Sequence, residues 1–158
     1  MANTTNLPGR LIGITLDGDY YNCQTAADLT LGTSLTKNPI CKPNPNGTTS
    51  ISWETSNVDA KNWQLTFSAQ SFLDSITGTK NNNDLLAKFI SGDLRVEAQF
   101  LTSADLTSQE NYDHDFLFEG AGLLTTVKVN APSTGASTYD VTITGNGEPT
   151  FTLIPATT

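Results

Sequence analysis

The clearest pattern along the chain is a strict alternation of apolar and polar residues in two segments. In one segment the apolar positions are Trp63, Leu65, Phe67 and Ala69. In the other, the apolar positions Leu94, Val96, Ala98 and Phe100 alternate with Asp93, Arg95, Glu97 and Gln99. Successive side chains of a β-strand point to opposite faces, so each segment predicts a strand with one buried face. The 25 threonines of the chain agree with this, because β-branched residues favour strands over helix interiors.

Further strands are predicted where apolar residues run between turn signals. The turn signals are Asp17-Gly18, residues 131–135 and Gly145-Asn146-Gly147. The predicted strands are residues 11–16, 20–24, 116–119, 123–129, 139–144 and 150–154. Short strands joined by tight turns pair as antiparallel hairpins. We therefore predict a mostly β fold, an antiparallel β-sandwich or split barrel.

Two segments depart from the period of two. Residues 83–92 place Leu85, Leu86, Phe89 and Ile90 at helical spacing, with Asn83 or Asp84 able to cap the start and Gly92 to end it. This predicts one short flanking α-helix. Residues 33–50 contain Pro39, Pro43, Pro45 and Gly47 among Asn and Lys, which excludes a central strand and predicts a long loop. A loop of that length is either functional or disordered until it binds.

Size and charge narrow the function classes. A chain of 158 residues fits one domain. Lys+Arg 8 against Asp+Glu 16 gives 8 − 16 = −8, which argues against a surface that holds nucleic-acid phosphates or anionic lipid. Neither a signal peptide nor a membrane span is recognised, so we expect synthesis in the cytosol and no membrane partner. Cys23 and Cys41 are then expected to be reduced thiols.

Candidate chemistry is sparse. His114, the only histidine, lies between Asp113 and Asp115, but on a strand both carboxylates would face away from the imidazole. A metal site or general base is therefore disfavoured, and we predict no catalytic residue, cofactor or metal ligand. The glycines Gly120, Gly122, Gly145 and Gly147 precede strand-like sequence and are interpreted as turns or bulges rather than a phosphate cradle. Trp63 is expected in the core, and the role of Trp53 is left open.

The order of motifs along the chain carries a resemblance. Residues 9–18 (GRLIGITLDG) open the series, followed by the long variable loop, the Trp63-x-Leu65-x-Phe67 strand, the Leu85-Leu86-x-x-Phe89 helix and the strand after it. The chain ends with residues 118–125 (FEGAGLLT), 129–132 (VNAP) and 139–148 (YDVTITGNGE). This series resembles the major tail protein, or tail tube protein, family of long-tailed bacteriophages and prophages. The resemblance spans nearly the whole chain as a single tail-tube-like domain, residues 1–158, and the loop at 33–50 departs from shorter versions.

The resemblance implies a structural virion protein with no enzymatic activity. Its subunits form hexameric rings, completing a larger barrel on oligomerisation, and the rings stack into a tail tube. The implied partners are other copies of the chain, the tape measure protein and further tail proteins, with genomic DNA passing through the lumen without specific binding. The implied location is the virion tail, assembled in the bacterial host cytoplasm. A neutral or acidic wall suits a DNA conduit, because Lys and Arg would bind each passing phosphate.

Two sets of residues are candidates for these roles. The lumen-lining candidates are Asp93, Glu97 and Gln99. The inter-subunit candidates lie in the long loop and are Leu35, Ile40, Cys41, Pro43 and Pro45. The loop offers apolar anchors that would be costly in permanent contact with water, which favours an assembly arm. A solvent-facing insertion is the alternative, since loop closure entropy grows slowly with length.

A binding module is the main alternative to the tail protein. A carbohydrate-binding or adhesin-like β-sandwich would use exposed aromatics such as Trp53, Tyr20 or Tyr21. It would be secreted, and Cys23 would be bonded to Cys41.

Overall fold

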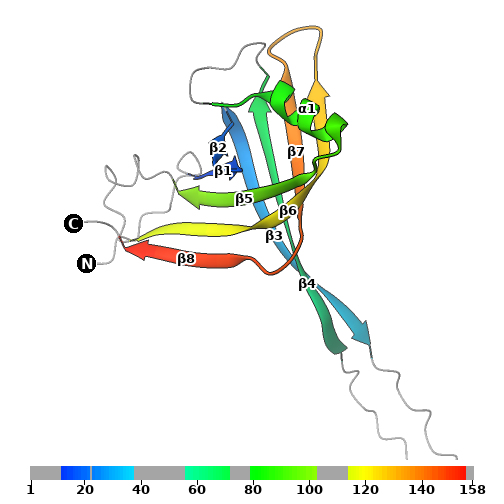
Figure 1. The fold of residues 1–158 in the computed structure, drawn as a ribbon, viewed down its shortest axis with the longest axis vertical. Coiled ribbons are helices and arrows are strands. Elements are labelled where there is room, and N and C mark those ends of the chain that lie inside the picture. The colour runs from blue at the N-terminus through cyan, green and yellow to red at the C-terminus, as the bar shows by residue number, and fades with distance from the viewer. Residues whose placement is uncertain (1–11, 22, 38–55, 72–78, 103–113, 156–158) are drawn as a thin grey trace, which may run out of the picture. The chain divides into compact units, whose positions relative to one another are not determined.

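The computed structural model describes residues 12–21, 23–37, 56–71, 79–102 and 114–155. These residues form eight strands and one helix (Figure 1), which are β1 (Ile12–Leu16), β2 (Asp19–Tyr20), β3 (Gln24–Lys37), β4 (Ser56–Gln70), α1 (Asn82–Ser91), β5 (Arg95–Thr102), β6 (His114–Asn130), β7 (Thr138–Gly145) and β8 (Thr150–Pro155). All strand pairs are antiparallel members of one sheet. The predicted mostly β fold with a single short helix is confirmed, and the sheet of the described residues does not close into a barrel.

The sheet is organised around the long strand β6. The strand order is β2-β1-β5-β6-β7-β4-β3, and β8 pairs with β6 beside this path. β5 lies along one edge of β6, while β8 pairs with residues 114–119 and β7 with residues 122–130 of the other edge. β6 therefore belongs to two half-sheets. Half-sheet I contains β2, β1, β5, the first part of β6 and β8, and half-sheet II contains the rest of β6 with β7, β4 and β3.

The core is formed by one face of each half-sheet. The fully buried residues of half-sheet I include Ile14, Leu16 and Ala98, and those of half-sheet II include Leu65, Val141 and Ile143. Phe67 packs edge-on against Tyr139 at 6.2 Å and at a tilt against Tyr21 at 5.8 Å between ring centroids. Burial of a side chain such as Ile14, Leu16 or Leu65 contributes about 1.5–3 kcal/mol to the free energy of unfolding. The alternation in the sequence therefore predicts the core faces correctly, and Trp63 is buried as predicted.

Helix α1 begins at Asn82, one residue before the predicted segment 83–92, and neither of the predicted caps, Asn83 or Asp84, is its N-cap. Asn81 is the N-cap, because its side chain accepts a hydrogen bond from the Asn83 N–H at 2.9 Å. Asp84 completes a capping box by accepting the Asn81 N–H at 3.1 Å. Gly92 ends the helix in the left-handed region, at φ 80°, as predicted. Leu85 is fully buried and fixes the apolar side of the helix on the core.

The two glycine pairs differ in structure. Gly120 and Gly122 were expected in a turn or bulge, but both lie inside the continuous strand β6, opposite Ala98 and Val96. The irregularity of β6 lies further on, between Leu124 and Thr126. The prediction of two separate strands there is wrong, because β6 continues through both glycines and pairs with β5 at each of them. Gly145 closes β7, and Gly147 has φ 117° in the connection to β8, which fits a turn.

The chain divides into two compact units. Unit 1 contains residues 1–30 and 64–158, and unit 2 contains residues 31–63. The described part of unit 2 comprises the second part of β3 and the first part of β4. Residues 33–37 are strand, so the first five residues of the predicted loop 33–50 are corrected to β3. Its remaining residues lie outside the described part of the chain.

Candidate functional site

A row of polar side chains crosses half-sheet I on the face opposite the core. The backbone register aligns Thr15 with Gln99, Gln99 with Glu119, and Glu119 with Thr150. Thr15 Oγ1 donates to Gln99 Oε1 at 2.8 Å, and Gln99 Nε2 donates to Glu119 Oε2 at 3.1 Å. Thr150 Oγ1 donates to Glu119 Oε1 at 3.4 Å. Side chains of four strands are thus joined into a polar row that leaves little freedom for each group.

The polar row contains the lumen-lining candidate Gln99, and a second candidate, Glu97, lies on the same face of β5. Glu97 is exposed and lies two residues from Gln99, on the same face of β5. Arg95 is also exposed on this face, so the charged residues there on β5 and on residues 116–123 of β6 are Arg95, Glu97 and Glu119. Asp93 is not on a strand; it follows α1 and pairs with Lys88 at 3.2 Å. Glu119 is absent from the predicted lumen-lining candidates. It is the last residue of the predicted strand 116–119, and the following Gly120 is interpreted from the sequence as a turn or bulge.

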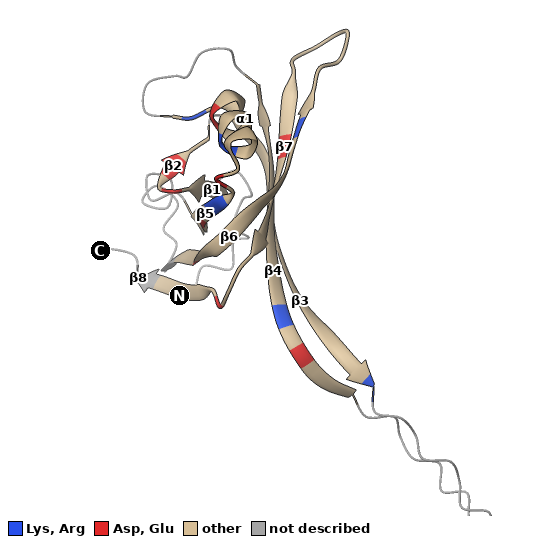
Figure 2. Cartoon of the chain, turned by 45° about the vertical axis from the view of Figure 1, so that its right-hand side comes forward, with Lys and Arg blue, Asp and Glu red and all other residues tan. Residues whose placement is uncertain are grey.

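Lys88 connects helix α1 to the tight turn after β1. Its Nζ donates to Asp17 Oδ2 at 3.0 Å and to Asp93 Oδ2 at 3.2 Å. Partial burial works against the charge of Lys88, but the hydrogen bonds to Asp17 and Asp93 raise the pKa of the amine. Asp17 Oδ1 also accepts the Glu97 N–H at 2.9 Å. These contacts tie α1 to the turn after β1 and, through Asp17, to β5; Figure 2 shows α1 beside these strands.

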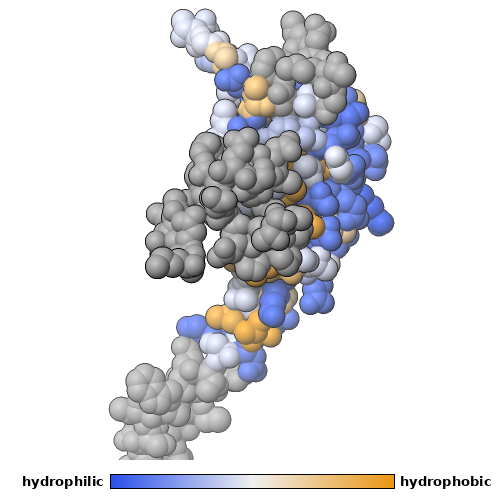
Figure 3. All heavy atoms as spheres, turned by 90° about the vertical axis from the view of Figure 1, so that its left-hand side faces the viewer, coloured by the Kyte–Doolittle hydropathy of each residue, from blue (hydrophilic) through white to orange (hydrophobic). Residues whose placement is uncertain are grey.

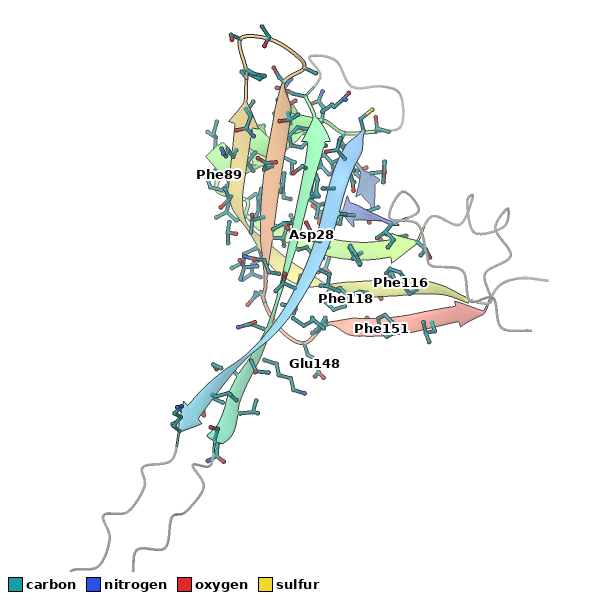
Figure 4. The ribbon with its side chains drawn as sticks, turned by 180° about the vertical axis from the view of Figure 1, so that it is seen from behind. Asp28, Phe89, Phe116, Phe118, Glu148 and Phe151 are labelled. Atoms are coloured by element: carbon teal, nitrogen blue, oxygen red, sulfur yellow. The ribbon has the colours of Figure 1, made fainter. Side chains whose placement is uncertain are left out.

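Apolar side chains extend from the core face of half-sheet I to the surface. Phe100, Phe116 and Phe151 come from neighbouring strands, with ring centroids 5.7 Å apart for the first pair and 6.4 Å for the second. Figure 4 shows Phe116 and Phe151 side by side on β6 and β8. Phe151 is 63% exposed and Leu153 is 57% exposed. The phenyl row therefore ends in an uncovered ring on β8. The sequence signal for it is the Thr150-Phe151-Thr152-Leu153 alternation.

Unit 2 has a second set of exposed apolar side chains. Leu31, Leu35 and Val58 are each more than half exposed. Thr36 donates a hydrogen bond to Asp59, which links the two strands. Figure 3 shows hydrophobic residues, in orange, exposed on the molecular surface beside hydrophilic residues, in blue. Of the inter-subunit candidates, Leu35 is an exposed strand residue, and Ile40, Cys41, Pro43 and Pro45 lie outside the described residues.

The residues proposed for a binding module are not gathered into a platform. Tyr21 is buried against Phe67, and burial is the main cause that raises its pKa, with Asp84 and Asp19 as smaller causes. Tyr20 is 43% exposed, and Trp53 lies outside the described residues. Cys23 is exposed with a free thiol, whereas its proposed partner Cys41 is not among the residues described.

The described residues contain no group of three or more His, Cys, Asp or Glu side chains able to hold a metal ion. His114 opens β6 opposite Pro155, and Asp113 lies outside the described part. No helix among the described residues has the length and apolar character that a membrane crossing requires.

Comparison with known proteins identifies the fold. No protein family matches the sequence, and no curated protein matches it. Among solved structures, a chain of the virion of a native gene transfer agent particle matches with a TM-score of 0.65 at 14% identity. A chain from the tail of an empty gene transfer agent particle with C6 symmetry matches with a TM-score of 0.66 at 14% identity. Each match covers 93% of this chain and 99% of the other. The fold is thus shared over nearly the whole length, which is consistent with the resemblance to tail tube proteins.

Proposed function

We propose that this chain is a structural subunit of a phage-like tail, and that six copies form rings that stack into a tube for DNA. The observation that carries the proposal is the near-complete fold match to a chain from a tail with C6 symmetry. The exposed apolar side chains of unit 2 and β8 support it, since large exposed apolar residues in strands are typical of interfaces. The chain then acts by assembly rather than as an enzyme, and its place is the virion tail.

The polar face of half-sheet I is the proposed wall of the lumen. Glu97, Gln99 and Glu119 lie on this face, and the hydrogen bonds of Gln99 and Glu119 hold both side chains along the sheet. Fixed carboxylates repel DNA phosphates, and neutral amides and hydroxyls release no condensed counterions. Among the lumen-lining candidates, Glu97 and Gln99 are retained and Asp93 is replaced by Glu119. On this face the carboxylates of Glu97 and Glu119 stand against the cation Arg95, which disfavours the retention of DNA.

Unit 2 is the proposed assembly arm. A two-stranded ribbon is marginally stable by itself in water, and Leu31, Leu35 and Val58 gain a favourable environment when a neighbour covers them. Ile40, Cys41, Pro43 and Pro45 remain the candidates for the rest of this contact. The tape measure protein and other tail proteins are the further proposed partners, inside and at the ends of the tube.

Assembly is tested with the purified full chain by light scattering over a range of concentrations and by negative-stain microscopy. We expect rings or tubes with six-fold symmetry. A protein that stays monomeric at high concentration, also when mixed with its tail partners, overturns the proposal and favours the binding module.

The arm is tested separately by replacing residues 38–55 with a short Gly/Ser linker between Lys37 and Ser56. The expected product unfolds cooperatively in urea, like the wild type, but builds no tubes. Normal tubes from this variant would mean that residues 38–55 are a tolerated insertion.

The wall is tested by adding cations to it. Glu97→Lys together with Glu119→Lys is expected to give tubes that retain DNA at low salt and release it as the salt concentration rises. Ser91→Lys, at an exposed position of α1, is the control and should not retain DNA. Equal DNA retention by the control and the wall variant would place the polar face outside the lumen.

A further inference from the structure

The connection between β7 and β8 contains the dipeptide Asn146-Gly147, at the place where the two half-sheets separate. β7 ends at Gly145 and β8 begins at Thr150, so residues 146–149 alone join two strands that pair with different parts of β6. The Asn146 N–H donates to the Ala121 carbonyl at 2.8 Å, which holds the start of the connection on β6. Figure 4 labels Glu148 in this connection, with its side chain directed away from the strands.

The side chain of Asn146 is exposed, and its amide makes no hydrogen bond to a described residue. Other asparagines are held by such bonds. Asn130 donates to Asp140 at 2.7 Å, and the Asn81 side chain accepts the Asn83 N–H at 2.9 Å. The Asn146 amide is therefore free to turn toward the peptide bond that follows it.

Gly147 leaves open space on the other side of that peptide bond. It is exposed, with φ 117°, and a Cβ placed on it would meet no atom within 4 Å. Because glycine has no side chain, another group can approach its backbone closely. Asn146 is the only asparagine among the described residues that precedes a glycine; the others are Asn57, Asn62, Asn81, Asn82, Asn83 and Asn130.

We propose that Asn146 is a site of spontaneous deamidation. The backbone nitrogen of Gly147 attacks Cγ of Asn146, the new C–N bond closes a succinimide ring, and the side-chain nitrogen leaves as ammonia with the proton of the Gly147 N–H. Water then opens the ring at either carbonyl and gives aspartate or isoaspartate. Water is the only co-reactant. Both reacting groups are held within one chain, which favours ring closure. The reaction belongs to the subunit and does not require the proposed assembly.

The two products change the subunit in different ways. Aspartate adds a negative charge beside Glu148 and next to Ala121, which pairs with Glu97 of the polar face. Isoaspartate adds the same charge and also inserts one carbon into the backbone of the short connection. The longer backbone loosens the hold of the connection on β8, so we expect the amides of residues 150–153 to exchange faster with solvent in the isoaspartyl form.

The test is prolonged incubation of the folded full chain at mildly alkaline pH, followed by proteolysis and mass spectrometry. The peptide that contains residue 146 should gain about 1 Da, because an amide becomes a carboxyl group. Its rate should exceed that of the peptide with Asn130 about tenfold or more. Asn146→Gln is the matched control, because its longer side chain would have to close a larger ring and should gain no mass. The peptide with Asn46-Gly47, the other pair of this kind, is measured separately.

Two outcomes would overturn the deamidation site. One is a folded chain in which residue 146 gains no mass although the urea-unfolded chain does, since the fold would then protect the amide. The other is an equal rate at Asn146 and Asn130. Asn146→Asp carries the charge without the longer backbone, so its residues 150–153 should exchange as in the wild type. Equal exchange of these amides in Asn146→Asp and in the isoaspartyl form would overturn the effect assigned to the backbone carbon.

Discussion

Replacing Gln24 by methionine should destabilise the subunit itself, even before any assembly. Methionine keeps the length and the apolar stem of the side chain but removes both hydrogen bonds to the backbone of Ile14. Ile14 is fully buried, so its N–H and carbonyl lose their partners in a place that water reaches poorly. A buried unsatisfied donor or acceptor costs about 1–3 kcal/mol.

Two such groups would cost about 2–6 kcal/mol in a dry site. Gln24 itself is only half-buried, so water can hydrate part of the freed backbone. We therefore expect a loss of about 2–4 kcal/mol in the free energy of unfolding. The assay is urea unfolding, at protein concentrations low enough to keep the subunits separate, with the m-value checked for a change in compactness.

Gln64→Met is the matched control, since Gln64 is an exposed glutamine on β4. Its effect should stay within about 0.5 kcal/mol, as for most surface substitutions. If Gln24→Met is as mild as this control, the two hydrogen bonds of the Gln24 amide do not stabilise the backbone of Ile14 in solution.

Three further measurements concern other parts of the subunit. The Tyr139 hydroxyl is buried without a hydrogen-bond partner among the described residues, so Tyr139→Phe should leave the free energy of unfolding unchanged or raise it slightly; a loss of more than about 1 kcal/mol would reveal an unseen partner. The hydrogen bond from Ser68 is the main cause that lowers the pKa of Asp140; burial opposes the shift and Asn130 adds to it. A lowered folded-state pKa stabilises the fold above about pH 4 and loses its effect as the pH falls through the folded pKa, so Asp140→Asn should be destabilising at pH 7 and less so at pH 3 in urea titrations. A destabilisation equal at both pH values would contradict this. Cys23 and Cys41 should both react with a thiol reagent after denaturation without reductant, and a protected pair would favour the secreted binding module.

The sequence predicts those strands in which one face is buried and the other is exposed. The alternations around Phe67 and Val96 fall in β4 and β5, and Asp17-Gly18 forms the tight turn, with φ 54° and 83° at its two residues. The outer halves of β3 and β4 escape this kind of prediction because both of their faces are exposed, which leaves no alternation to detect.

The candidate site depends on register, which a single sequence does not reveal. Glu97 and Gln99 can be assigned to one face from their spacing, but their alignment with Glu119 requires the pairing of β5 with β6. The sequence predicts Gln24 as the last residue of a strand over residues 20–24. In the structure, Cys23 has a left-handed backbone conformation, at φ 52°, which separates Gln24 from β2. The side chain of Gln24 bonds to the backbone of Ile14 instead. No local pattern signals a side chain that replaces a strand.

In the proposed assembly, copies of this chain build a six-fold tube whose wall is the polar face of half-sheet I. A cryo-electron microscopy reconstruction of the assembled protein tests it most directly. We expect six subunits per ring, with Glu97, Gln99 and Glu119 facing the lumen and Phe151 covered by a neighbouring copy. A reconstruction with another symmetry, or with the polar row on the outside of the tube, would contradict it.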